Sequence, residues 1–278
     1  VTTGFSVSEF KGNILSGQSS VNFTDSSFGQ VSNNKFEAGC IITMTGCTNS
    51  IFVDNLFNTA VITFVDSNIG SMLENNITTS VILGDAGTTI TYFDLNVFIS
   101  NDITLGINNL DVSGATIVNY SGNVVTGNSQ VNLSDCISGQ FLNNSISVSS
   151  INGSGGTFST FVNNVVGQNT SLDIQNSYFT EFTGNIFLAY STISMNDLVG
   201  VVTSFSYNEF LGATLSYDSS YIGSFQLNIL KNGASIDRNG GLPFVGQIYN
   251  NNIQNGAVIY LLSANITGIY NNLSLIHI

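Results

Sequence analysis

The chain repeats one pattern of apolar and polar positions along its length. An apolar residue, most often Phe, lies three positions before an Asn, and this pair recurs at intervals of 20 to 27 residues, most of them 20 or 21. A second apolar residue usually lies three positions before the first, and an apolar-x-apolar segment follows the Asn by some eight to ten residues. Val, Ile, Thr, Phe and Tyr are frequent in these segments, and Gly, Asn and Ser separate them. Each repeat therefore predicts two or three short strands joined by turns.

A repeat of about 21 residues cannot bury its own apolar face, so its strands must stack on the equivalent strands of neighbouring repeats. The sequence therefore predicts a solenoid, in which residues at one place in successive repeats lie directly over one another. The repeated Asn occupies thirteen positions: Asn13, Asn34, Asn55, Asn76, Asn96, Asn123, Asn144, Asn164, Asn185, Asn208, Asn228, Asn251 and Asn272.

This column of Asn residues indicates scaffold rather than chemistry. Asn has both a carbonyl acceptor and an amide donor, so stacked Asn side chains can bond to one another without limit, whereas stacked Asp side chains would repel. A catalytic or ligand-binding Asn is needed once, but this one occurs in every repeat. The residue three positions earlier, as in Phe161-x-x-Asn164, should likewise form an interior aromatic stack.

The same residues carry a family resemblance. The Asn column, the short strands and the period near 21 resemble the right-handed parallel β-helices of the pectate-lyase-like superfold. The F-x-x-N repeat, with small residues in LGATL (211–215), NGASI (232–236) and NGAVI (255–259), is also similar to polymorphic outer-membrane adhesin repeats, although the G-G-A-I of those repeats does not occur. The resemblance covers nearly the whole chain. It implies an all-β, right-handed parallel β-helix solenoid of about 13 coils with an internal Asn ladder.

A leucine-rich repeat is the competing interpretation, because it also has apolar residues three positions before and two positions after an Asn. Its other strand leucine would lie five positions before the Asn. In this chain the apolar position lies six before, and no helical segment follows.

We expect a single β-helix domain over residues 1–272, open at both ends. Two segments should project from it, GINNLDVSGAT (106–116) and RNGGLPF (238–244), which contains the sole Pro. The chain begins with Val1, and its last six residues, LSLIHI (273–278), are the translation of CTG TCT CTT ATA CAC ATC. That string looks like a sequencing adapter carried into a metagenomic reading frame. We therefore interpret the chain as an internal fragment and exclude His277, the only His, as a candidate base.

Composition narrows the class of partner. Hydrophobic residues make up 42% of the chain, but charged residues only 8%, against roughly 25% in typical globular proteins. Four Lys and Arg against seventeen Asp and Glu give a net charge of −13, which disfavours nucleic acid and anionic membranes as partners. No apolar run reaches the roughly 18 residues of a membrane span. Cys40, Cys47 and Cys136 lack a C-x-x-C spacing, so we expect buried, unpaired thiols, no metal site and no cofactor.

Three carboxylates are the candidate binding residues. Counted from the repeated Asn, Glu74 and Asp94 fall in one column of adjacent coils, with Asp54 one position away in the coil before. Their side chains could lie roughly 5 Å apart, close enough to share a proton or a Ca²⁺ ion. A solvated, mutually repelling group is the alternative. Catalysis on sugars would also need a cleft with stacking aromatics, and the chain has no Trp, so no catalytic residue is assigned.

The only mixed-charge group in one coil is Lys231, Asp237 and Arg238, beside the Pro-containing segment. A solvated surface ion pair is the simpler interpretation of this group.

Two functions fit these observations. The first is a non-catalytic structural or adhesive segment of a secreted, cell-surface or virion fibre protein, with surface glycans or host proteins as partners. The second is the shaft of a carbohydrate-active β-helix protein, such as a polysaccharide lyase, a hydrolase or a phage tailspike. A pocket joining Glu74, Asp94 and outer-face aromatics would favour the second. Ice binding through flat Thr arrays is disfavoured, because no T-x-T column recurs. The sequence favours the first function and an extracellular or cell-surface location.

Overall fold

The computed structural model describes residues 2–99, 108–111, 114–127, 129–133, 135–147, 149–153, 155–196, 201–218, 221–238, 244–260 and 265–274. These residues form short parallel strands joined by turns, and no helix occurs among them. Three successive strands make one coil, and they belong to three different sheets, which we call sheets A, B and C. The protein is an all-β parallel β-solenoid with a period near 21 residues, as the repeat predicts.

The chain divides into two compact units, Val1–Ser138 (unit 1) and Gly139–Ile278 (unit 2). Strand β20 (Ile137–Leu142) contains the boundary.

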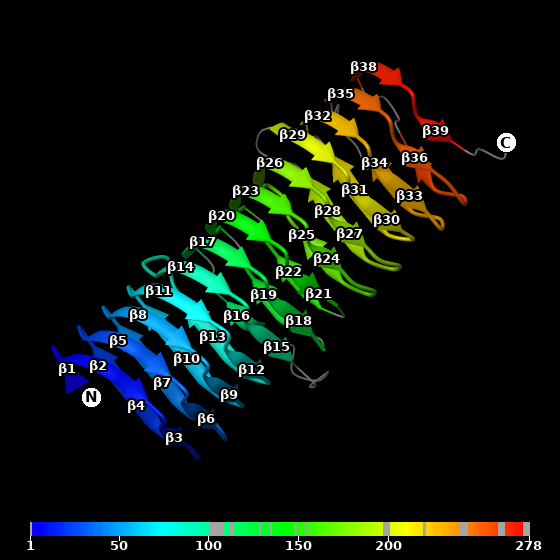
Figure 1. Cartoon of the computed structure of the whole chain (residues 1–278). Helices are drawn as coiled ribbons and strands as arrows, with labels where there is room; N and C mark the ends of the chain where they lie inside the picture. The colour runs from blue at the N-terminus through cyan, green and yellow to red at the C-terminus, as the bar shows by residue number, and fades with distance from the viewer. Residues whose placement is uncertain are drawn as a thin grey trace. The chain divides into compact units, whose positions relative to one another are not determined.

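Unit 1 contains the strands of the first coils in simple order. In sheet A the order is β1 (Thr2–Thr3), β4 (Ser20–Thr24), β7 (Ile41–Thr45), β10 (Val61–Val65), β13 (Val81–Gly84), β16 (Asn108–Asp111) and β19 (Gln130–Asn132). In sheet B the order is β2 (Ser6–Lys11), β5 (Ser27–Ser32), β8 (Thr48–Val53), β11 (Asn68–Leu73), β14 (Thr89–Asp94) and β17 (Thr116–Ser121). In sheet C the order is β3 (Ile14–Leu15), β6 (Lys35–Glu37), β9 (Leu56–Asn58), β12 (Asn76–Thr78), β15 (Val97–Ile99) and β18 (Val124–Thr126). In Figure 1 strands β2 to β14 of sheet B lie side by side in this order.

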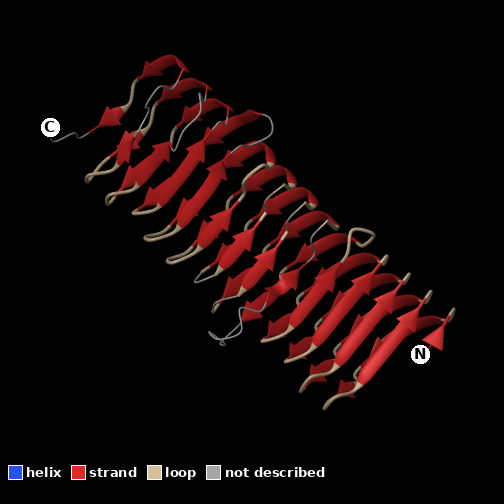
Figure 2. Ribbon diagram, turned by 180° about the vertical axis from the view of Figure 1, so that it is seen from behind, coloured by secondary structure: helices blue, strands red, loops and turns tan. Residues whose placement is uncertain are grey.

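Unit 2 follows the same plan. In sheet A the order is β22 (Ser150–Asn152), β25 (Ser171–Asp173), β28 (Thr192–Asn196), β31 (Thr214–Asp218), β34 (Ser235–Arg238) and β37 (Val258–Ile259). In sheet B the order is β23 (Thr157–Val162), β26 (Tyr178–Thr183), β29 (Val201–Ser206), β32 (Tyr221–Gln226), β35 (Phe244–Tyr249) and β38 (Asn265–Tyr270). In sheet C the order is β21 (Ser145–Ile146), β24 (Val165–Val166), β27 (Ile186–Phe187), β30 (Glu209–Leu211), β33 (Ile229–Lys231), β36 (Asn252–Ile253) and β39 (Leu273–Ser274). Figure 2 shows these short strands and the loops between them from behind.

The apolar positions of the repeat fill the interior of the coils. In β23 and β26 of sheet B the second and fifth residues are buried, and Phe158 and Phe161 of β23 pair in register with Phe179 and Phe182 of β26. In unit 2 the Phe residues three positions before the Asn form the predicted aromatic stack, with ring centroids 4.9 to 5.0 Å apart from one coil to the next, and Ile248 and Ile269 follow them in the column. The members of this stack are Phe141, Phe161, Phe182, Phe205 and Phe225. In unit 1 the same column is mixed, because Met72 occupies it beside Phe52 and Phe93.

The Asn column forms the predicted ladder in each unit. Asn185 shows the pattern: its backbone N–H and its Nδ2 both donate to Oδ1 of Asn208, at 3.0 Å each. The same Nδ2 donates to the carbonyl oxygen of Phe161 at 2.9 Å, and Oδ1 of Asn185 accepts from the backbone N–H and Nδ2 of Asn164. Both amide hydrogens and both acceptor positions are therefore occupied inside a buried column, which a carboxylate could not achieve.

One member of the predicted ladder is wrong. The fourth rung is Asn75, which donates to Oδ1 of Asn96 and accepts from Asn55. Asn76 begins β12 and is exposed. Asn75 and Asn76 are consecutive, and counting 21 residues from Asn55 selects the second, whereas this coil is one residue shorter. The buried residue three positions before the rung is accordingly Met72 and not Leu73.

The predicted projecting segment 106–116 is also wrong in part, because its residues Asn108–Asp111 form β16 of sheet A and pair with β13 and β19. The additional residues of this long interval fall between Ile99, the end of β15, and Asn108. Of RNGGLPF, Arg238 ends β34 and Phe244 begins β35, and residues 239–243 lie outside the described residues, as does His277. Leu273 and Ser274 pair with Asn252 and Ile253.

The three cysteines, Cys40, Cys47 and Cys136, are buried and form no disulfide, as expected. Burial raises the pKa of the Cys40 thiol, which keeps it protonated and unreactive.

Candidate functional site

The turn from sheet B to sheet C places one residue per coil at a sharp corner, directly before the ladder Asn. In unit 1 this corner residue has a positive φ in every coil from Gly12 to Gly122, including Asp54 (φ 55°) and Glu74 (φ 54°). A single residue in the left-handed conformation bends the chain at this corner, and Gly, Asn and Asp adopt that conformation most readily. Asp54 and Glu74 are therefore exposed neighbours on adjacent coils.

The predicted alignment of Glu74 with Asp94 is wrong, because it was counted from Asn76. Counted from Asn75, Glu74 shares its column with Asp54, and Asp94 lies one position earlier, at the end of β14. Asp94 pairs in register with Leu73 of β11 and Ser121 of β17. The structure thus places two acids on the corner and the third on the outer face of sheet B.

The carboxylate of Asp94 is held by the next coil. The backbone N–H of Ser121 donates to Oδ1 of Asp94 at 3.0 Å, and the Ser121 hydroxyl donates to the same oxygen at 2.8 Å. Nδ2 of Asn119 donates to Oδ2 at 3.3 Å. These bonds fix the carboxylate against β17, half-buried among outer-face side chains.

The surroundings of Asp94 change the pKa of its carboxyl group. Burial raises the pKa of the Asp94 carboxyl above its usual range, and the hydrogen bonds from Ser121 and Asn119 oppose that shift without cancelling it. A partly desolvated carboxylate with a raised pKa is a feature of binding sites as well as of structural clusters.

An aromatic side chain lies beside this carboxylate. Tyr92, two residues before Asp94 on β14, also points outward and is 48% exposed. It pairs in register with Ser71 of β11 and Asn119 of β17. We call the group formed by Tyr92, Asp94, Asn119 and Ser121 the Asp94 surface.

Three members of the Asp94 surface were not among the residues predicted from the sequence. Tyr92 and Asn119 each lie four positions before their ladder Asn, and Asp94 and Ser121 each lie two before. Counting back from the ladder across the 27-residue interval would have placed all four on one outer face. Spacing from the ladder therefore predicts this surface, whereas acidity alone singles out only Asp94 among its four members.

In the predicted group of Lys231, Asp237 and Arg238, the structure separates Lys231 from Asp237. Lys231 ends β33 in sheet C, whereas Asp237 lies on β34 in sheet A. The Lys231 ammonium instead lies 3.9 Å from a carboxylate oxygen of Glu209, in the preceding coil, with both side chains about a third exposed. Such a surface pair contributes little to stability.

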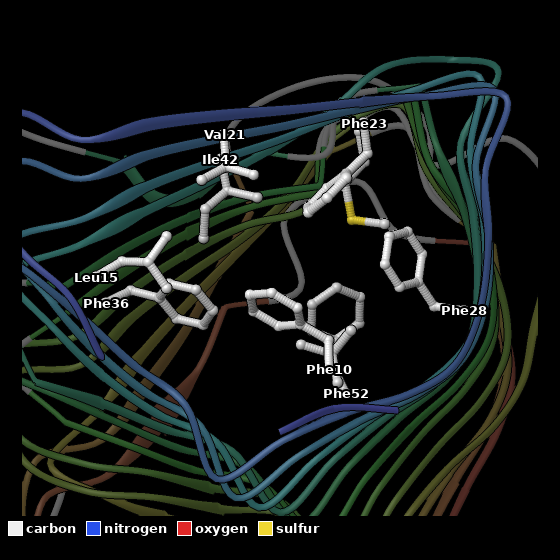
Figure 3. Close-up of a pocket in the computed structure, with 10 residues that line it drawn as sticks. Phe10, Leu15, Val21, Phe23, Phe28, Phe36, Ile42 and Phe52 are labelled. Atoms are coloured by element: carbon white, nitrogen blue, oxygen red, sulfur yellow. The ribbon is translucent and has the colours of Figure 1, made fainter. Parts of the chain in front are cut away.

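A pocket lies inside the first coils of unit 1 rather than on the outer face. Its lining is entirely apolar and includes Phe10, Leu15, Phe23, Phe36 and Phe52, and the rings point toward one another around a free space of about 10 Å³ (Figure 3). That space holds roughly one water molecule. With no polar group to orient a ligand, this pocket is a packing gap in the core.

Among the described residues, no group of three or more His, Cys, Asp and Glu side chains is arranged to hold a metal ion. No helix in the described part of the chain is long and apolar enough to cross a membrane. Comparison of the chain with protein-family models, curated proteins and solved structures gave no match.

Proposed function

We propose that this chain is a structural or adhesive β-helical segment of an extracellular, cell-surface or virion fibre protein. The observation that carries the proposal is the difference between the inside and the outside of each coil. The repeated Phe and Asn residues form the interior stack and ladder, while the outward positions are mostly small polar side chains that differ from coil to coil. Such a design provides a rigid support on which surface residues can change without altering the fold.

Further features of the proposal rest on the repeat and on general rules of chain topology. Parallel strands joined by crossovers are almost always connected in the right-handed sense, which supports a right-handed β-helix of the pectate-lyase-like kind. The interval of 21 residues between Asn123 and Asn144 also occurs within each unit. It supports a single solenoid domain of about 13 coils. The F-x-x-N resemblance to outer-membrane adhesins supports surface glycans or host proteins as partners.

The test is a pair of measurements on the recombinant chain. The protein is applied to arrays of immobilised glycans and extracellular proteins, and it is separately incubated with a panel of polysaccharides. We expect retention on particular array ligands and no release of reducing or unsaturated sugar ends. Release above that of heat-denatured protein would contradict the proposal.

A second function, the shaft of a carbohydrate-active protein, is favoured by one observation. The exposed ring of Tyr92 and the carboxylate of Asp94 lie side by side on the outer face of β14, and an aromatic ring next to a carboxylate suits a sugar. If the polysaccharide panel shows cleavage, Asp94→Asn should abolish it, whereas Glu181→Gln, on the outer face of β26, should not.

A further inference from the structure

The Asp94 surface has an unusual balance of donors and acceptors. The N–H and hydroxyl of Ser121 and the amide of Asn119 all donate to Asp94, so the donors of β17 at this site are already engaged. The half-buried carboxylate of Asp94 can still accept further bonds, and the Tyr92 hydroxyl is the one remaining side-chain donor of the Asp94 surface. The acceptor positions of the carboxylate therefore outnumber the donors that the surface itself has left.

No cationic side chain of unit 1 compensates the charge of Asp94. The Lys residues of this unit are Lys11 and Lys35, in the first and second coils, whereas Asp94 is in the fifth. Three coils correspond to about 14 Å at a strand spacing of about 4.8 Å, beyond the Debye length of about 8 Å at physiological ionic strength. The charged residue nearest along the corner is Glu74, which adds negative potential.

The missing partner is thus a cation that carries several N–H donors. A guanidinium group meets each requirement: it is planar, it donates to a carboxylate in bidentate fashion, and it stacks on an exposed aromatic ring such as Tyr92. A neutral sugar would leave the charge of Asp94 unpaired, and the net charge of −13 favours the approach of a basic partner.

We propose that the Asp94 surface binds an arginine side chain of a basic segment in a partner protein, with the guanidinium paired to Asp94 and stacked on Tyr92. This inference rests on the adhesive role proposed above and names the chemistry of the partner.

The test uses the full chain and two capped peptides, one rich in arginine and one with citrulline at the same positions, which keeps the shape but removes the charge. Binding is measured by isothermal titration calorimetry. We expect the arginine peptide to bind more weakly as salt increases, and the citrulline peptide to bind at least about tenfold more weakly than the arginine peptide, the factor that loss of a charge-assisted pair brings.

Variants locate the site. Asp94→Asn should weaken binding of the arginine peptide by about tenfold or more, and Tyr92→Ala by about three- to tenfold through loss of the stacked ring. The matched control is Glu181→Gln, which removes the same charge from the outer face of sheet B in unit 2 and should leave binding unchanged. The unfolding midpoint of each variant shows whether it is folded.

Equal binding of the two peptides would overturn the inference, because the positive charge of arginine would then contribute nothing. Equal effects of Asp94→Asn and Glu181→Gln would also overturn it, because general negative charge would then attract the peptide. Retention on neutral glycans that depends on Tyr92 would also overturn it in favour of a sugar ligand. Absence of peptide binding with retention on the arrays removes this inference and leaves the adhesive function intact. Cleavage of polysaccharides removes the proposed function whatever the peptides show.

Discussion

At the scale of single residues, the ladder explains why Asn and no other residue repeats. A rung inside the ladder, such as Asn185, uses its two amide hydrogens and both acceptor positions of its oxygen, and the bonds between rungs have donor–acceptor distances of 2.8 to 3.2 Å. Asp has the acceptors but not the donors, and Ala has neither. Either replacement would leave buried polar groups of the neighbouring rungs without a partner, and each such group lowers the free energy of unfolding by about 1 to 3 kcal/mol.

Replacement of Asn185 by Asp should destabilise the protein by about 3 kcal/mol or more, because it buries a charge and removes both donors. Asn176→Asp is the matched control. Asn176 is exposed in a turn with φ 53°, a conformation that Asp also adopts, so this change should cost less than about 0.5 kcal/mol. Urea unfolding followed by circular dichroism measures both. Equal midpoints would remove our explanation of the ladder.

The adjacent residues Asn75 and Asn76 provide a second comparison. Asn75→Ala should cost about 2 to 3 kcal/mol, because the side chain of this rung makes buried bonds to Asn55, Asn96 and the Phe52 carbonyl. Asn76→Ala removes an exposed side chain that accepts from Thr78 and should cost about 0.5 kcal/mol or less. Denaturant midpoints of the two variants decide which Asn is the rung, and the reverse order would restore the count made from the sequence.

The raised pKa of Asp94 predicts a pH dependence of stability. Above the unfolded value of about 3.8 and up to the folded value, the native state holds more protons than the unfolded state, so stability falls as pH rises through this range. Glu74 is the charged residue on the neighbouring corner, and Asn119 and Ser121 of β17 carry no charge.

The measurement is the unfolding midpoint at a series of pH values from below 3.8 to neutral. The Asn side chain of Asp94→Asn cannot titrate. The unfolding midpoint of this variant, relative to that of the natural protein, should therefore increase as pH rises from the unfolded to the folded pKa of Asp94. A constant difference between the two proteins would show that the pKa of Asp94 is not shifted.

At the scale of elements, the corner from sheet B to sheet C fixes the length of the strands on either side. Each coil turns there through one left-handed residue, and most coils place Gly, Asn or Asp at it. Leu95 is an exception, since it combines a φ of 56° with 54% exposure. Its side chain lies over Gly122 of the next coil, just as Asn163 lies over Gly184.

Leu95→Asn should therefore stabilise the protein by about 0.5 to 1 kcal/mol, because Asn tolerates the left-handed conformation better than Leu and little apolar contact is lost. The reciprocal change, Asn163→Leu, should destabilise by a similar amount. Thermal unfolding of both variants tests the idea, and a loss of stability in Leu95→Asn would show that its contact with Gly122 outweighs the backbone strain.

Strand pairing also shows which features the sequence could reveal. The period, the strands and the ladder follow from spacing alone, because stacking requires the same residue types at the same interval. The choice between Asn75 and Asn76 does not follow, since it depends on a coil that is one residue shorter. The strand Asn108–Asp111 could not be predicted either, because the length of the interval does not indicate which of its turns contains the added residues. The Asp94 surface needed neither answer, because its members lie at matched distances before Asn96 and Asn123 and pair in register across the long interval.

At the scale of the whole molecule, stability in a solenoid is close to a sum over coils and over the contacts between neighbours. Removal of one complete coil should therefore be tolerated. Deletion of residues 164–184 joins Asn163 to Asn185, so that Phe161 again lies three positions before a rung. We expect this variant to keep the β signal in circular dichroism and a cooperative unfolding transition, with a modestly lower midpoint.

A deletion of half that length within the same segment is the control. It shifts the inward residues of the following strand away from the core and leaves a rung without its neighbour, so we expect an unfolded or aggregated product. Similar behaviour of the two deletions would show that the coil is not the unit of stability.

The ladder also has a direction. Within each unit, the rungs bond to one another in one sense: Nδ2 of a rung donates to Oδ1 of the next rung along the chain, and the second amide hydrogen goes to a backbone carbonyl of the preceding coil. The side-chain dipoles are consequently aligned head to tail, so each unit has permanent electrical polarity, with its negative pole at the first rung and its positive pole at the last. The two faces of any coil differ chemically, one offering oxygen and the other N–H, and a further coil can add to either face in only one orientation.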